Sequence, residues 1–303
     1  MKATYLTSML MLCVISIASG QVNYKWFSSI NASQNTNYFI YNSTHNQVFI
    51  SSWDGLNIYD GLEVKTYRPS THHMQGNKID SPFFEDSTGK VWFATKEALH
   101  YYNPESDDLD YMFMHDECGE VIKSNYRLFL LSGNNLYMSA EKHLIVYDVA
   151  RSTINKIVSL DSANFTPSDI ILDHGKILLF SIDLAGYAMY ELDERNNIKL
   201  VYNAKGNFSA YCRTVTNKIW LGKEDGSLMQ FDLLNGEILY DYTFVGSRII
   251  GIQELSGNKL LISIHPNEIF EFDPAQRKIS NWFIPRRSGT KESADYLTNP
   301  FLD

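Results

Sequence analysis

The fold is decided by a stretch in the first third of the chain, Asp86-Ser87-Thr88-Gly89-Lys90-Val91-Trp92-Phe93-Ala94-Thr95. A turn of small and polar residues leads here into a short apolar and aromatic run, which is the pattern of a hairpin that enters a buried β-strand. Such runs begin at Val48, Val91, Leu136, Ile177, Ile219 and Leu260, with spacings of 43, 45, 41, 42 and 41 residues. The chain is therefore a repeat protein.

Each repeat contains signals for four short strands. An aromatic residue followed by a polar one comes 11 to 13 residues after the start of each run, as in Tyr59-Asp60 and Phe272-Asp273. A further apolar run precedes each apolar and aromatic run, as at 169–172, and another ends the unit, as at 238–242. Four-stranded units of a little over 40 residues are typical of β-propeller blades. We expect an all-β propeller with six complete four-stranded blades and the start of a seventh.

The seventh blade is expected because the chain ends inside the pattern. Residues 297–303 repeat the apolar and polar order of residues 79–86, and residues 23–27 resemble the last strand of the sixth unit at 280–283. Residues 299–303 would supply the first strand of a closing blade and residues 23–27 its fourth, so the natural protein would continue beyond Asp303. The alternative is a six-bladed ring with a loose C-terminal tail.

The first 20 residues have the features of a secretory signal peptide. Lys2 is followed by an apolar run from Leu6 to Ala18, and Ala18-Ser19-Gly20 supplies the small residues of a cleavage site. We expect cleavage before Gln21, which leaves the propeller in residues 21–303 and an exported chain. The location would be periplasmic, or secreted if the chain is complete, and membrane attachment would have to come from sequence beyond Asp303.

Charge and cysteine content narrow the classes of partner. The net charge of −9 becomes −10 when Lys2 is removed, because 25 basic residues then face 35 acidic ones. A negative surface repels phosphate backbones, so no direct nucleic-acid binding is expected. Only Cys118 and Cys212 remain after cleavage, and they fall in different units, so we expect two separate buried thiols, with a disulfide between them as the alternative.

The chain has few patterns that indicate catalysis or metal binding. His72 and His73 are adjacent on an extended segment, where their side chains point apart, and no further ligands accompany them. Residues 86–92 are similar to the aspartate box of sialidases but lack its serine or threonine, so the segment is interpreted as a hairpin turn. No nucleophile elbow and no phosphate-binding loop occurs in the sequence. We expect no catalytic residue, no metal and no cofactor.

The repeats resemble those of the two-component regulator propeller family. Residues 86–95 followed by Ala98-Leu99-His100-Tyr101-Tyr102-Asn103 carry the pattern best, and residues 53–60 and 218–222 carry parts of it. The third unit lacks the Asp-x-x-Gly turn, and the fourth has a longer loop at 182–186. Such propellers form the periplasmic sensor region of bacterial hybrid histidine kinases and related regulators. The resemblance implies that this chain is an N-terminal part of a sensor and that the kinase lies downstream.

A ligand would be expected at one mouth of the central channel. The loops between second and third strands and the loops that enter the innermost strands converge there. The polar and aromatic residues of these loops are Trp53, Asp54, Asp80, Asn125, Lys223, Glu224, Arg248 and His265. An aromatic ring with amides and charges suits a saccharide, through stacking and hydrogen bonds.

Three functions remain open from the sequence. The first is a ligand-sensing propeller of a two-component or transmembrane regulator, which binds an oligosaccharide or another small ligand without turnover. The second is a secreted scaffold for protein interaction or homodimerisation, which predicts an apolar patch on an outer blade face. The third is a propeller hydrolase or lyase, which predicts an acid and a base with shifted pKa values at the channel.

Overall fold

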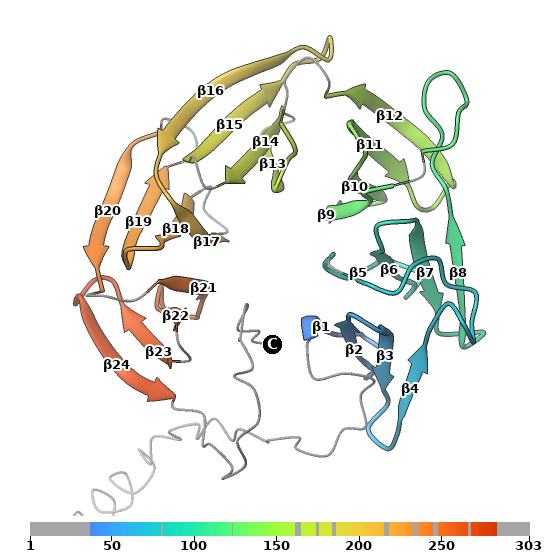
Figure 1. Ribbon diagram of the computed structural model, residues 1–303, viewed down its shortest axis with the longest axis horizontal. Helices are drawn as coiled ribbons and strands as arrows, with labels where there is room; N and C mark the ends of the chain where they lie inside the picture. Colours follow the sequence, from blue (N-terminus) through green and yellow to red (C-terminus); the bar gives the residue numbers. More distant parts are fainter. Residues whose placement is uncertain are drawn as a thin grey trace, which may run out of the picture. The chain divides into compact units, whose positions relative to one another are not determined.

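A computed structural model describes residues 37–79, 81–122, 124–160, 165–173, 176–183, 186–214, 218–232, 236–244, 248–265 and 268–283. These residues form 24 strands in six four-stranded antiparallel sheets. No helix long and apolar enough to cross a membrane occurs among them. The expected all-β propeller with six four-stranded blades is confirmed (Figure 1). The strands expected for a seventh blade and the signal peptide lie outside the described residues.

The first three sheets follow the chain in order. The first contains β1 (Asn37–Asn42), β2 (Val48–Ser52), β3 (Gly55–Tyr59) and β4 (Val64–Tyr67). The second contains β5 (Phe84–Glu85), β6 (Val91–Ala94), β7 (Leu99–Asn103) and β8 (Asp108–Met112). The third contains β9 (Arg127–Ser132), β10 (Asn135–Ala140), β11 (His143–Asp148) and β12 (Thr153–Ser159). The runs that begin at Val48, Val91 and Leu136 thus lie in the second strand of each sheet.

The other three sheets repeat this order. The fourth contains β13 (Asp169–Asp173), β14 (Lys176–Asp183), β15 (Gly186–Leu192) and β16 (Ile198–Lys205). The fifth contains β17 (Phe208–Arg213), β18 (Lys218–Lys223), β19 (Ser227–Asp232) and β20 (Ile238–Thr243). The sixth contains β21 (Ile249–Glu254), β22 (Leu260–Ile264), β23 (Glu268–Asp273) and β24 (Lys278–Phe283). The first strand of each sheet lies nearest the centre in Figure 1, and the fourth lies at the rim.

Successive side chains of the inner strands pack against opposite neighbouring sheets. In β14, Leu178 and Phe180 pack against the fifth sheet, whereas Leu179 between them packs against the third. Trp92 of β6 likewise packs toward the third sheet, and Phe93 packs toward the first. The side-chain period of a strand is two residues, so a strand buried on both faces serves two interfaces. Five hydrophobic clusters join the six sheets in this way, and each cluster draws on two adjacent sheets.

Aspartates in the repeat pattern close the hairpin turns. Asp86 is buried and accepts hydrogen bonds from the Trp92 indole nitrogen at 2.7 Å and from the backbone nitrogen of Thr88 at 2.8 Å. Asp60 begins the turn between β3 and β4, and its carboxylate accepts hydrogen bonds from the backbone nitrogens of Leu62 and Glu63 at 2.8 and 2.9 Å. The bond from Glu63 is the main cause that lowers the pKa of Asp60. The interpretation of residues 86–92 as a hairpin turn is confirmed, because this carboxylate is committed to the turn.

Two local predictions differ from the structure. The residues around 182–186 were expected to form a loop, but Asp183 pairs with Gly186, so β14 and β15 continue on both sides of the connection. Cys118 and Cys212 are both free, as expected, but Cys118 is exposed, so the prediction of two buried thiols is wrong for this residue. Cys118 lies in the β8–β9 connection, in a turn from Asp116 to Glu120, and its backbone nitrogen donates to the carboxylate of Asp116 at 2.9 Å.

Candidate functional site

The innermost strands surround a central cavity of about 830 Å³. Every sheet contributes at least one residue to its lining, from the first strand or from a loop next to it. The lining residues are Phe39, Pro82, Arg127, Leu128, Phe129, Ser168, Asp169, Ser209, Ala210, Tyr211, Cys212, Arg213, Arg248, Ile250, Ile252, Gln253 and His265. The volume lies within the range of small-molecule sites in proteins.

Irregular pairing of the first strands directs side chains toward this cavity. Register shifts interrupt the pairing of the first and second strands in the fifth sheet between Phe208 and Ala210, and in the sixth between Ile249 and Gly251. The bulge in β17 contains Ser209, whose hydroxyl donates a 2.6 Å hydrogen bond to the carbonyl of Ile249 in the next sheet. A bulge re-aims a side chain relative to regular pairing. These positions therefore combine cavity lining with contact between sheets.

Asp169 lies at the start of β13 and is the one carboxyl group among the described residues that line the cavity. One carboxylate oxygen accepts a hydrogen bond from the backbone nitrogen of Ile170 at 2.7 Å. Burial raises the pKa of Asp169 to about 6, although that hydrogen bond and the positive charges of Arg213 and Arg127 act in the opposite direction. The cost of desolvation exceeds the attraction of the two guanidinium groups at this site.

Tyr211 and Arg213, two residues apart on β17, extend across to β13. The hydroxyl of Tyr211 donates to the carbonyl of Ser168 at 3.0 Å, and Nη1 of Arg213 donates to the carbonyl of Ile170 at 3.0 Å. Burial raises the pKa of Tyr211, so it is a neutral hydrogen-bond donor at ordinary pH. Burial also raises the pKa of Cys212, to about 11. The polar groups of β17 are thus fixed in place before any ligand binds.

Two of the residues predicted from the sequence line the cavity, whereas Lys223 and Glu224, at the end of β18, do not. Arg248 and His265 line the cavity, and the backbone nitrogen of His265 donates to the carbonyl of Arg248 at 2.8 Å. Nη1 of Arg248 lies 3.6 Å from a carboxylate oxygen of Glu224. Lys223 precedes Glu224, and its ammonium lies 5.4 Å from the ring centroid of Phe208. The loops of the fifth and sixth sheets therefore converge here as expected.

Trp53, Asp54 and Asn125 do not line the cavity either. Trp53 is 52% exposed, and the ammonium of Lys78 lies 4.9 Å from its ring centroid. Asp54 pairs with Nε of Arg68 at 2.8 Å in the same sheet. Asn125 is exposed and has a left-handed backbone conformation with φ of 59°. Asp80 lies outside the described residues. A ligand role for any of these residues stays a prediction.

Sequence reasoning missed Arg127, Asp169, Tyr211 and Arg213. The residues predicted from the sequence are expected in loops, whereas these four lie within the innermost strands. A signal was present, because charged residues begin or end the apolar first runs of the third, fourth and fifth units. A charge in a strand that is otherwise buried on both faces indicates a channel-lining position.

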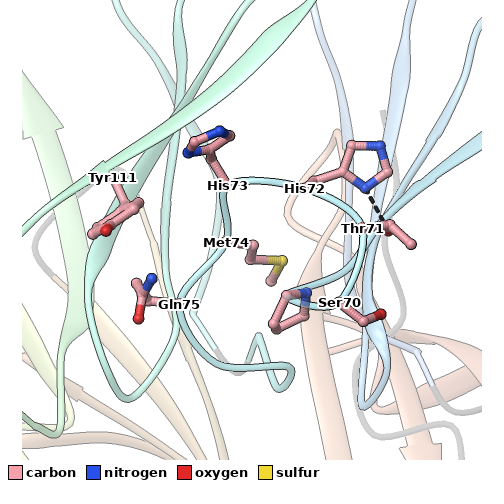
Figure 2. Close-up of a pocket in the computed structure, with 8 residues that line it drawn as sticks. Ser70, Thr71, His72, His73, Met74, Gln75 and Tyr111 are labelled. Atoms are coloured by element: carbon pink, nitrogen blue, oxygen red, sulfur yellow. Dashed lines mark hydrogen bonds between the residues drawn. The ribbon is translucent and has the colours of Figure 1, made fainter.

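A second, smaller pocket of about 340 Å³ lies in the connection between β4 and β5 (Figure 2). Its lining includes His72, whose Nδ1 lies 2.7 Å from Oγ1 of Thr71, and the neighbouring His73. Burial lowers the pKa of His72. Among the residues that the structure describes, no group of three or more His, Cys, Asp or Glu side chains could hold a metal ion.

The six sheets and the cavity at their centre define the chain as a six-bladed β-propeller with a lined channel. No family model and no curated protein matches it. The solved structures that it is similar to include the extracellular domain of a proposed one-component system of B. thetaiotaomicron, BT4673, with 18% identity and a TM-score of 0.66 over 93% of this chain.

Two further structures extend the comparison. The extracellular domain of a proposed hybrid two-component system of the same organism, BT3049, has 20% identity and a TM-score of 0.64 over 88% of this chain. The C-terminal WD40 domain of Sif2 has 13% identity and a TM-score of 0.59 over 87% of this chain, which corresponds to 74% of that domain. The present chain spans only 38% and 36% of the two bacterial domains. At these identities the likeness shows the propeller fold.

Proposed function

We propose that this chain is an extracytoplasmic ligand-sensing propeller of a two-component or transmembrane signalling regulator, and that its ligand is a saccharide. The observation that carries the proposal is the likeness to the extracellular domains of two bacterial signalling systems, together with a cavity of about 830 Å³ in the propeller. The repeat pattern of residues 86–103 supports the same assignment independently of the structure.

The proposal includes the location and the domain arrangement. Residues 1–20 would direct export and be removed, and residues 21–303 would form the sensor propeller in the periplasm. The membrane segment, the histidine kinase and other output domains would belong to a longer regulator. The bacterial domains with the same fold are much longer than this chain, which is consistent with a sensor assembled from several parts.

The cavity is suited to binding without turnover. Its fixed donors, Tyr211 and Arg213, are already hydrogen-bonded to backbone carbonyls, and the turn aspartates such as Asp60 and Asp86 are committed to hairpins. Preorganised polar groups beside aromatic and aliphatic side chains are typical of sugar and small-molecule sites. Glycoside hydrolysis has less support, because the described lining residues include one carboxyl group, whereas that reaction usually needs two.

The test is a binding screen with the purified chain. Oligosaccharides of different composition are titrated by calorimetry, and each ligand that binds is incubated with the protein and analysed by mass spectrometry. Saturable binding with an unchanged ligand would support the sensor function. Cleavage of a bound saccharide would refute the sensor function in favour of an enzyme. Absence of binding to any saccharide would refute the proposal that the ligand is a saccharide.

An interaction scaffold or homodimer is the second candidate, and one observation favours it. The outermost strands of the fourth and fifth sheets expose apolar side chains in succession, with Leu200 and Val201 of β16 at 46% and 43% and Ile238 and Leu239 of β20 at 54% and 43% exposure. Exposed apolar residues on an edge strand favour pairing with another chain. Light scattering during gel filtration would test this function, and a monomer at all accessible concentrations would refute homodimerisation.

A further inference from the structure

The lining of the central cavity carries a charge opposite to that of the whole chain. The chain has a formal net charge of −9, whereas the cavity presents three arginines, Arg127, Arg213 and Arg248, and one carboxyl group, that of Asp169. Among the described residues that line the cavity, three guanidinium groups thus face the single carboxyl group of Asp169, and Glu224 approaches only Arg248, at 3.6 Å. A positive site inside an acidic protein concentrates anions.

Two of the guanidinium groups are placed to receive a ligand. Arg213 lies on β17 and is oriented by its 3.0 Å bond to the carbonyl of Ile170. A guanidinium has five N–H donors in one plane, so this single bond fixes the orientation without exhausting the donors. Arg127 starts β9 and lies over the ring of Phe129, with its central carbon 5.9 Å from the ring centroid. Both residues line the cavity, and the positive charge of each opposes the rise in the pKa of Asp169, so both guanidinium groups lie within electrostatic range of this carboxyl group.

The remaining lining suits an organic molecule rather than a bare inorganic ion. Phe39 and Phe129 supply aromatic surface, and Ile250 and Ile252 supply aliphatic surface. Aromatic faces stack on the C–H faces of sugar rings and other flat organic groups. The volume of about 830 Å³ is far larger than a sulfate or phosphate needs and lies in the range of ligand cavities.

We propose that the central cavity binds an organic anion of about monosaccharide to disaccharide size, whose carboxylate or sulfate group is held by Arg127 and Arg213. The inference rests on the proposed sensor function, because it specifies the ligand class of the same cavity. Guanidinium groups bind carboxylates and sulfates through paired, charge-assisted hydrogen bonds. The ligand could be an acidic saccharide or a non-sugar organic acid, and these two share the chemistry that the arginines recognise.

The test compares ligands that differ in charge but match in size. Galacturonate and digalacturonate are titrated into the purified chain by calorimetry beside galactose and galactobiose, and citrate represents the non-sugar acids. We expect the acidic saccharides to bind at least about tenfold more tightly than their neutral partners, and the affinity to fall as salt is added.

Substitutions then locate the binding site. We expect R127Q and R213Q each to weaken binding of the preferred anion at least about tenfold, because each removes a charged pair of donors. R213K keeps the charge but loses the planar donor pair, so its affinity should lie between that of R213Q and that of the unmodified chain. R195Q, in the exposed turn between β15 and β16, is the matched control and should bind like the unmodified chain. Because Arg213 also holds β13, R127Q tests the site if R213Q fails to fold.

The outcomes separate this inference from the sensor function. Equal binding of neutral and acidic saccharides, or binding that R127Q leaves unchanged, would overturn the anion site while saccharide sensing stands. Binding of citrate but of no saccharide would support the anion site and refute the proposal that the ligand is a saccharide. Absence of binding by all of these compounds would overturn both.

Discussion

The carboxyl group of Asp169 offers a direct test of the cavity electrostatics, through the substitution D169N. Asparagine has the same shape and keeps the oxygen that accepts the Ile170 backbone hydrogen bond. It removes only the ionisable proton. Burial raises the native pKa of Asp169 from an ordinary value of 3.8 to about 6. The native state therefore binds this proton more tightly than the unfolded chain does.

The sign and the size of the effect follow from linkage. Stability contributed by the protonated carboxyl is fully present below the unfolded pKa and is lost as the pH rises toward the native pKa of about 6. A difference of about two between the unfolded and native pKa values of Asp169 corresponds to roughly 3 kcal/mol in the free energy of unfolding. We expect D169N and the unmodified chain to have similar stability near pH 4, and D169N to be more stable by up to about 3 kcal/mol at pH 8.

Urea unfolding followed by tryptophan fluorescence at a series of pH values measures the difference. Subtracting the two curves cancels the titration of all other groups. D241N, on the exposed strand β20, removes one negative charge far from the cavity lining and serves as the control. If D169N were instead the less stable protein at pH 8, the ionised carboxylate would be stabilised by Arg127 and Arg213, and the argument from burial would be refuted.

Three further predictions concern the turns and the thiols. G55A should destabilise the protein by about 2 kcal/mol or more in urea unfolding, because Gly55 has φ of 113° and a Cβ there would overlap a backbone carbonyl of β4. G61A, at an open turn, should cost about 1 kcal/mol in the same assay. Equal losses of stability in the two variants would contradict the overlap. D86A should cost about 3 kcal/mol, because a buried indole nitrogen and turn amides lose their acceptor; a loss below about 1 kcal/mol would show that water replaces the carboxylate. Iodoacetamide at mild alkaline pH should label the exposed Cys118 before Cys212, whose pKa burial raises to about 11, as followed by peptide mass spectrometry; labelling of Cys212 first would contradict its burial.

The blades could be predicted from the sequence because their signals are local. The runs at Val91 and Ile219 mark second strands, and aromatic residues such as Tyr59 end third strands, since alternation and turn chemistry act within a few residues. The Asp86 turn was identified for the same reason. The extension of β14 and β15 was missed because Asp183 and Gly186 have no strong strand preference and pair only through the continuing ladder.

The cavity could be predicted only in part, because it depends on distances between sheets. Arg248 and His265 were found, since the position of a loop in the repeat indicates which mouth it approaches. Asp169 and Arg213 were missed, because their proximity depends on how the fourth and fifth sheets pack and not on either repeat alone. The exposure of Cys118 was missed for a related reason, since the long β8–β9 connection follows no repeat rule.

The five hydrophobic clusters that lie between sheets have a consequence for how the protein folds. Among the described residues, each hydrophobic cluster lies between two adjacent sheets, and none is confined to a single sheet. An isolated blade is therefore not an independent folding unit, and cooperativity must pass from sheet to sheet as in a linear array of coupled elements. Damage to one interface, such as that around Phe180, should loosen the two sheets beside it first and leave distant blades protected from hydrogen exchange.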